Sequence, residues 1–141
     1  MCIRECIAPL ATLQNPQHAA EYWHANIPSA SWYDPCKEAL VVLVLNTRRR
    51  ILGHNLVALG TLDSVTVHAR EVFRPVIAAA GHALVLAHNH PSGDSTPSEA
   101  DIKVTRDLIR AGQLLKIEVL DHIIIGEKTT SLKELGYFYA G

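Results

Sequence analysis

Two histidines and an aspartate stand at spacings that suit a metal ion. His88 and His90 follow the apolar run at residues 83–87, which is predicted to be a buried strand. Because side chains at positions i and i+2 of a strand point to the same face, both imidazoles can bind one ion. Asp101 follows a loop that contains Pro and Gly, so its carboxylate can fold back onto the strand end from the first turn of a predicted helix. Two imidazoles, a carboxylate and a water suit a Lewis-acid zinc site, and we predict one zinc ion per chain.

Each half of this pattern also has a purely structural explanation. Eight histidines in 141 residues produce close pairs by chance. Ser98 and Asp101 have the spacing of a helix-capping box, in which the serine is the N-cap and the aspartate is favoured near the helix N-terminus. Each half alone therefore indicates ordinary structure, whereas the combined pattern H-x-H-x7-S-x2-D is specific for a metal site.

The elements that must position these residues predict one α/β domain, with strands and helices mixed around one sheet. We expect strands at residues 38–45, 51–62 (one or two strands), 64–68, 83–87 and 117–125, helices at residues 16–26, 70–80 and 98–115, and one helical turn at 131–135. The apolar face of the longest helix is predicted to contain Ile102, Val104, Leu108, Ile109, Leu114 and Leu115. Residues 1–16 are predicted to be an N-terminal arm and residues 17–141 the domain.

The segment from His88 to Asp101, HNHPSGDSTPSEAD, resembles the JAMM signature of MPN-domain metalloproteases. Further segments resemble the RadC family, namely EALVVLVLN at 38–46, GTL at 60–62, HAREVF at 68–73, AHNHPSG at 87–93 and LDHIIIG at 120–126. The likeness covers residues 17–141. Longer RadC proteins carry an N-terminal helix-hairpin-helix region, for which this chain has no room, so the resemblance is to the short single-domain members.

The resemblance implies a mixed sheet flanked by helices in the MPN (JAMM, cytidine-deaminase-like) fold, with zinc held by His88, His90 and Asp101. It implies a zinc-dependent hydrolase that cleaves peptide or isopeptide bonds by a zinc-activated water. It also maps the serine that stabilises the oxyanion to Ser98, and the glutamate that acts as general acid and base to Glu38.

Four further assignments remain open at this stage. Glu71 is the alternative general base, although a glutamate at the start of a predicted helix is favoured there by the helix dipole anyway. Glu38 is preferred because of its place before a strand in the family pattern. Asp121 and His122 are predicted either to orient a ligand imidazole or to be structural.

Composition limits the other functions. The chain is 48% hydrophobic and 19% charged with a net charge of -1, so it can form a core, and direct nucleic-acid binding is not expected. Three cysteines and no secretory leader argue against a disulfide framework, and no run is apolar enough to span a membrane, so we expect a cytoplasmic protein. The alternatives to an enzyme are a RadC-like, DNA-repair-associated protein and a non-catalytic zinc-binding interaction module. The sequence leaves the peptide or protein substrate and the oligomeric state open.

Overall fold

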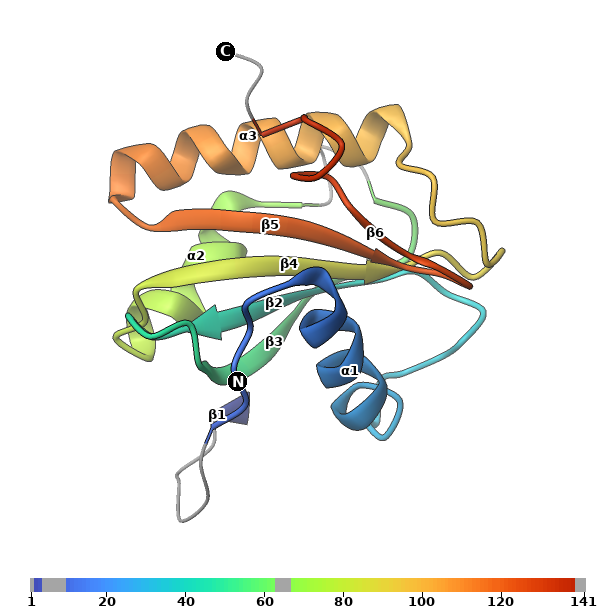
Figure 1. Ribbon diagram of the computed structural model, residues 1–141, viewed down its shortest axis with the longest axis horizontal. Coiled ribbons are helices and arrows are strands. Elements are labelled where there is room, and N and C mark those ends of the chain that lie inside the picture. The colour runs from blue at the N-terminus through green and yellow to red at the C-terminus, as the bar shows by residue number, and fades with distance from the viewer. Residues whose placement is uncertain (1, 4–9, 63–66, 139–141) are drawn as a thin grey trace.

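The computed structural model describes residues 2–3, 10–62 and 67–138, without the side chains of residues 2 and 3. These residues form six strands and three helices (Figure 1). The strands are β1 (Cys2–Ile3), β2 (Ala39–Leu45), β3 (Ile51–Leu59), β4 (Ala83–Asn89), β5 (Glu118–Ile125) and β6 (Thr129–Ser131). The helices are α1 (Pro16–Asn26), α2 (Ala69–Ala78) and α3 (Glu99–Leu115).

One mixed sheet contains all of these strands, in the order β1-β3-β2-β4-β5-β6. The central strands β2 and β4 are buried at every residue, as expected for apolar strands covered on both faces. They are antiparallel, with Leu40 opposite His88, whereas β4 and β5 are parallel and are joined by α3. This topology brings the start of β2, the end of β4 and the start of α3 to the same end of the molecule.

The two faces of the sheet carry separate apolar cores. Figure 1 shows α1 in front of the sheet and α2 behind it. On one face, the side chains of β2 and β4 pack against α1, whose Trp23 is 2% exposed. On the other face, they pack against α2 and α3, which contribute Phe73 and Leu108. The α/β fold expected from the sequence, a mixed sheet flanked by helices, is confirmed.

The apolar face predicted for α3 was wrong at its C-terminal end. Leu114 is 86% exposed and Leu115 is 49% exposed. The buried residues of α3 are Asp101, Val104, Thr105, Leu108 and Gly112. Each of these positions lies three or four residues from another one, so they form one stripe. The stripe ends in a glycine because the chain passes close to the helix there.

The ends of the sheet differ from the sequence prediction. β1 pairs with β3, and Thr12 bridges to Arg50, so part of the predicted arm lies along the sheet. The segment predicted as a helical turn at 131–135 begins with the last residue of β6, and an α-helical hydrogen bond from Leu135 to Ser131 follows. The strand predicted at 64–68 falls largely on residues 63–66, which lie outside the described residues. Among the helices that the structure describes, none is long and apolar enough to cross a membrane.

Candidate metal centre

The two histidines lie side by side at the end of β4. His88 is completely buried, and His90 follows Asn89, the last residue of the strand. Alternate residues of a strand share a face, so both imidazoles point toward the face that α2 and α3 cover. Their Nε2 atoms are 2.9 Å apart. The spacing of the two residues therefore produces the convergence that the sequence predicts.

The carboxylate of Asp101 reaches both imidazoles from the first turn of α3. The Asp101 N–H donates to Oγ of Ser98 (3.1 Å), and the Ser98 N–H donates to Oδ2 of Asp101 (2.8 Å), which completes a capping box. Asp101 Oδ1 lies 3.3 Å from Nε2 of His88, and Oδ2 lies 3.2 Å from Nε2 of His90. The same carboxylate thus caps the helix and faces both rings.

A backbone carbonyl determines which nitrogen of His90 carries the proton. Nδ1 of His90 lies 2.7 Å from the carbonyl oxygen of Asp94. Because a carbonyl oxygen only accepts, Nδ1–H must be the donor. In the neutral ring, Nε2 then carries a lone pair, and this lone pair points at Asp101 and His88.

A buried chain of hydrogen bonds determines the proton position of His88 in the same way. The Thr105 hydroxyl donates to the carbonyl oxygen of Asp101 (2.7 Å), so Thr105 Oγ1 accepts from Nδ1–H of His122 (2.6 Å). Burial lowers the pKa of His122 well below its usual range, and the nearby His88 adds to this, so His122 is neutral. Its Nε2 therefore accepts from Nδ1–H of His88 (2.7 Å), which leaves the lone pair of His88 Nε2 toward the centre.

The three groups could hold one metal ion. Metal-to-ligand bonds of about 2.0–2.1 Å place neighbouring ligand atoms of a tetrahedron about 3.3 Å apart. The two Nε2 atoms are 2.9 Å apart, Nε2 of His90 is 3.2 Å from Oδ2 of Asp101, and Nε2 of His88 is 3.3 Å from the other oxygen, Oδ1. One ligand atom from each of the three residues lies within 4.8 Å of the other two. Burial opposes ionisation of Asp101, but His88 and the Ser98 amide outweigh it and hold the pKa of the carboxyl well below its usual range. The centre therefore favours a positive charge between these groups.

The general-base candidate Glu38 lies one residue before β2, at the end of the sheet that carries the two histidines. Leu40 is opposite His88, so Glu38, two residues earlier, lies on the same face of the sheet as both histidines. The carboxylate of Glu38 accepts from the Leu62 N–H at 3.3 Å. Ser98 is exposed, and its accepting bond from Asp101 leaves the hydroxyl hydrogen available for donation.

The alternative base Glu71 lies in the first turn of α2, where it forms an exposed ion pair with Arg74 (3.1 Å). Phe73, two residues later, lies next to Gly112 of α3. Gly112 is eleven residues beyond Asp101, or about 16 Å along a helix. The structure therefore brings Glu38, rather than Glu71, to the end of the sheet that carries the histidines.

A β-bulge at Leu120 determines which faces of the sheet Asp121 and His122 occupy. The pairing of β4 with β5 skips one residue, since Leu84 is opposite Val119 but Val85 is opposite Asp121. The bulge changes which residues of β5 face α3, so His122 lies beneath His88. Asp121 lies on the other face of the sheet and does not reach the centre.

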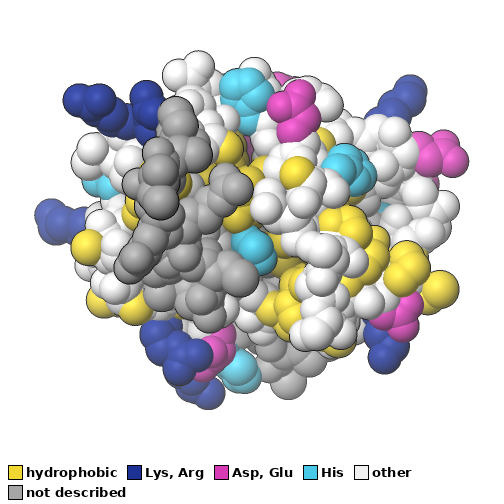
Figure 2. Space-filling view, turned by 90° about the horizontal axis from the view of Figure 1, so that it is seen from below, with side chains coloured by type: hydrophobic (Ala, Val, Ile, Leu, Met, Phe, Trp, Pro, Cys, Tyr) yellow, Lys and Arg dark blue, Asp and Glu magenta, His cyan; other side chains and the backbone are white. Residues whose placement is uncertain are grey.

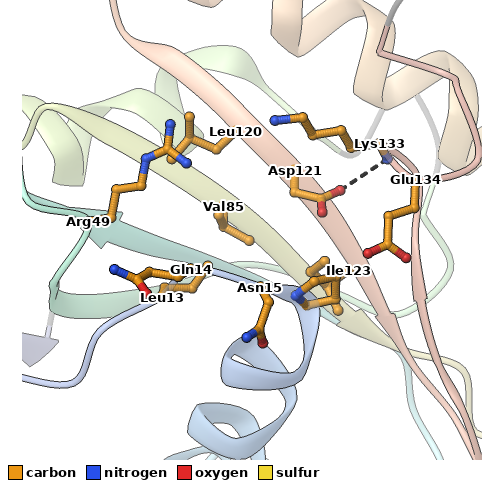
Figure 3. A pocket seen from close by; sticks show the side chains of 11 residues that line it. Leu13, Gln14, Asn15, Arg49, Val85, Leu120, Asp121, Ile123, Lys133 and Glu134 are labelled. Atoms are coloured by element: carbon orange, nitrogen blue, oxygen red, sulfur yellow. Dashed lines mark hydrogen bonds between the residues drawn. The ribbon is translucent and has the colours of Figure 1, made fainter.

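On that other face, Asp121 lines a pocket of about 450 Å³ beside the start of α1 (Figure 3). Its carboxylate accepts from the Ser131 hydroxyl (2.6 Å) and from the N–H groups of Lys133 (3.1 Å) and His122 (2.7 Å). Burial raises the pKa of Asp121 despite these bonds. Its hydrogen bonds thus join β5, β6 and the turn that follows.

Sequence reasoning missed Thr105 and the carbonyl group of Asp94. Thr105 stands four residues after Asp101, on the same face of the helix, and this spacing was the available signal. A buried threonine in an apolar stripe marks a polar partner on the facing strand. A carbonyl acceptor such as that of Asp94 leaves no trace in the sequence, because every residue has one.

Fold and site together define an α/β domain of the JAB/MPN class in which His88, His90 and Asp101 could hold a metal ion. A family model described as "RadC-like JAB domain" matches residues 13–137, and the chain belongs to this family, which is related to the JAMM/MPN proteins.

Similar proteins are known in several bacteria under the name UPF0758 protein. That of Chlorobaculum parvum is 47% identical over 114 residues, which are 81% of this chain and 49% of the relative. That of Staphylococcus haemolyticus is 47% identical over 115 residues (81% and 50%), and that of Moorella thermoacetica is 52% identical over 99 residues (70% and 43%). The chain spans about half the length of the relatives it matches.

Proposed function

We propose that this domain is a zinc-dependent hydrolase that cleaves peptide or isopeptide bonds with an activated water. The observation that carries the proposal is the convergence of two imidazole lone pairs and one carboxylate, with the proton of each ring held on its far nitrogen. Such a donor set needs a cation, and His88, His90 and Asp101 would hold one zinc ion per chain.

The roles of the chain's own residues follow from their positions. Zinc, when bound, is a Lewis acid that lowers the pKa of a coordinated water to about 7. Glu38, on the same face as the histidines, takes a proton from the attacking water and passes it to the leaving nitrogen. Ser98 donates its hydroxyl hydrogen to the carbonyl oxygen that gains negative charge.

A peptide or protein is the substrate class that this chemistry favours, and the charge distribution offers no support for direct nucleic-acid binding. The net charge is -1, and on the face seen in Figure 2 the Lys and Arg side chains lie in separate groups around the rim, several of them beside acidic side chains. A DNA-repair-associated role, a cytoplasmic location and the oligomeric state stay open predictions.

The test combines metal analysis with a cleavage assay. Purified protein loaded with zinc and desalted is expected to hold one zinc per chain and to cleave members of a pool of fluorescence-quenched peptides, including isopeptide-linked ones, until a chelator is added. Glu38→Gln should keep the metal and lose hydrolysis, whereas the matched control Glu71→Gln should keep both.

Three results would redirect this proposal. Absence of bound zinc after loading refutes the metal centre. Bound zinc with no cleavage of any peptide in the pool favours the non-catalytic zinc-binding module. Full activity of Glu38→Gln together with an inactive Glu71→Gln reverses the choice of base.

A further inference from the structure

Asn89 stands between the two histidines in the sequence but points to the opposite face of the sheet. Its side chain is only 7% exposed, and both ends of the amide are bonded to backbone. Oδ1 accepts from the Ala39 N–H at 2.8 Å, and Nδ2 donates to the Lys37 carbonyl oxygen at 3.0 Å. The two backbone groups that Asn89 binds are therefore those on either side of Glu38.

This side chain takes over where the backbone ladder stops. The pairing between β2 and β4 ends with Leu40 opposite His88, one residue before Asn89. Beyond that point, the bonds from Asn89 to Ala39 and Lys37 continue the connection between the two chains. The amide thus joins the segment that contains Glu38 to the strand end that carries both histidines.

The other attachments of Glu38 come from the opposite side. Its carbonyl oxygen accepts from the Gly60 N–H (2.7 Å), and its carboxylate accepts from the Leu62 N–H (3.3 Å). Both donors lie just after β3. In the described part of the chain, Asn89 provides the side chain that reaches from β4 to the backbone on either side of Glu38.

We propose that Asn89 is a positioning residue, which sets the distance between the Glu38 carboxylate and the two histidines. The effect of Asn89 on catalysis rests on the proposed function, because that effect requires Glu38 to be the general base. Misplacement of a catalytic group by about 1 Å can cost on the order of a hundredfold in rate, so a bond on each side of Glu38 matters for catalysis as well as for folding.

A purely structural amide provides the matched control. Oδ1 of Asn46 accepts from the N–H groups of Arg48 (2.9 Å) and Arg50 (3.0 Å) in the turn after β2. Asn46 thus also makes two backbone bonds, at the opposite end of the same strand. Replacing it removes comparable bonds without disturbing Glu38.

The test compares Asn89→Ala with Asn46→Ala in the full chain. Both variants should lose stability, and both should bind one zinc. Only Asn89→Ala should accelerate hydrogen exchange of the Ala39 amide in the metal-free protein, by about fivefold. Crystal structures should show Glu38 displaced relative to His88 in that variant alone. On a peptide that the wild type cleaves, kcat should fall about tenfold or more with little change in KM.

A double variant separates positioning from general damage. In the Glu38→Gln background, Asn89→Ala should cause no further loss of kcat, because the group that it positions is already absent. Asn89→Leu, which keeps an apolar volume against the α1 face, replaces Asn89→Ala if the alanine variant does not fold. Unchanged Ala39 exchange and an unmoved Glu38 in the folded variant would overturn the positioning role. A wild type that cleaves nothing would instead refute the proposed function, and the exchange and crystal data would still decide on Asn89.

Discussion

The hydroxyl group of Thr105 determines, through His122, which ring nitrogen of His88 carries the proton. It donates to the carbonyl of Asp101 and accepts from His122, and His122 in turn accepts from His88. Each bond has one permitted direction once the first is fixed. The orientation of the His88 Nε2 lone pair toward the centre therefore depends on a residue one helix turn beyond Asp101.

Thr105→Val, an almost isosteric change, tests this series of hydrogen bonds from Thr105 to His88. Valine removes the acceptor for His122, so His122 can turn its proton toward His88 and the ligand loses its orientation. We expect zinc affinity to fall about 10- to 100-fold, the usual effect of removing a partner of a metal-bound histidine. Competition with a chromophoric chelator measures it. Thr12→Val, beside the turn that joins β2 to β3, is the control. Equal zinc affinities for the two variants would contradict the role of this chain of hydrogen bonds.

Asp101 gives a pH-dependent stability that can be measured without metal. Its pKa lies below the usual value in the folded protein, so the stabilisation is fully present above the unfolded pKa of about 3.9 and is lost as the pH falls through the folded pKa. Asp101→Asn retains an oxygen for the capping bond from Ser98. Urea unfolding in chelator should show the variant less stable from pH 6 to 8, with the difference shrinking below about pH 4. A difference that grows on acidification would contradict the assignment.

The secondary-structure elements were predictable where their pattern is long. Buried apolar runs identified β2 and β4, and the capping box identified the start of α3. β6 was missed because Thr129–Ser131 is short and polar and becomes a strand through pairing with β5. The bulge in β5 is a property of two paired strands, so sequence could suggest His122 near the site but could not separate it from Asp121.

Gly112 explains why the predicted apolar face of α3 failed near its end. A Cβ atom at this position would clash with the backbone oxygen of Ile117, a residue that begins the return to β5. α3 therefore packs closely against the backbone of Ile117 through Gly112, while Leu114 and Leu115 face outward.

Gly112→Ala should be destabilising although alanine favours helix by about 1 kcal/mol over glycine. The new methyl group meets a backbone atom that cannot move alone, and such overpacking typically costs about 1–3 kcal/mol. Urea unfolding measures the free energy of unfolding of this variant and of the control Gln113→Ala, which changes an exposed residue on the same turn. A Gly112→Ala protein more stable than wild type would show that the turn relaxes freely.

For the whole molecule, the site connects elements that are distant in the sequence. His88 and His90 come from the strand end, Asp101 from the helix start, and Glu38 from the beginning of β2. An ion held there would bind the folded chain and not the unfolded one. Zinc should therefore stabilise the entire domain rather than one loop.

Unfolding with and without zinc measures this linkage. With free zinc about 100-fold above its Kd, the free energy of unfolding should rise by about 2.7 kcal/mol. His90→Ala, which removes the less buried ring, should lose that increment while it remains folded. An equal increment in the variant and the wild type would mean that the zinc binds elsewhere.

A crystal structure of the zinc-loaded protein, with anomalous data at the zinc edge, shows whether one ion lies between the two Nε2 atoms and the carboxylate. We expect one strong anomalous peak per chain, about 2.0–2.2 Å from Nε2 of His88, Nε2 of His90 and an oxygen of Asp101. A peak bound through Nδ1 of either ring, or located away from Asp101, would contradict it.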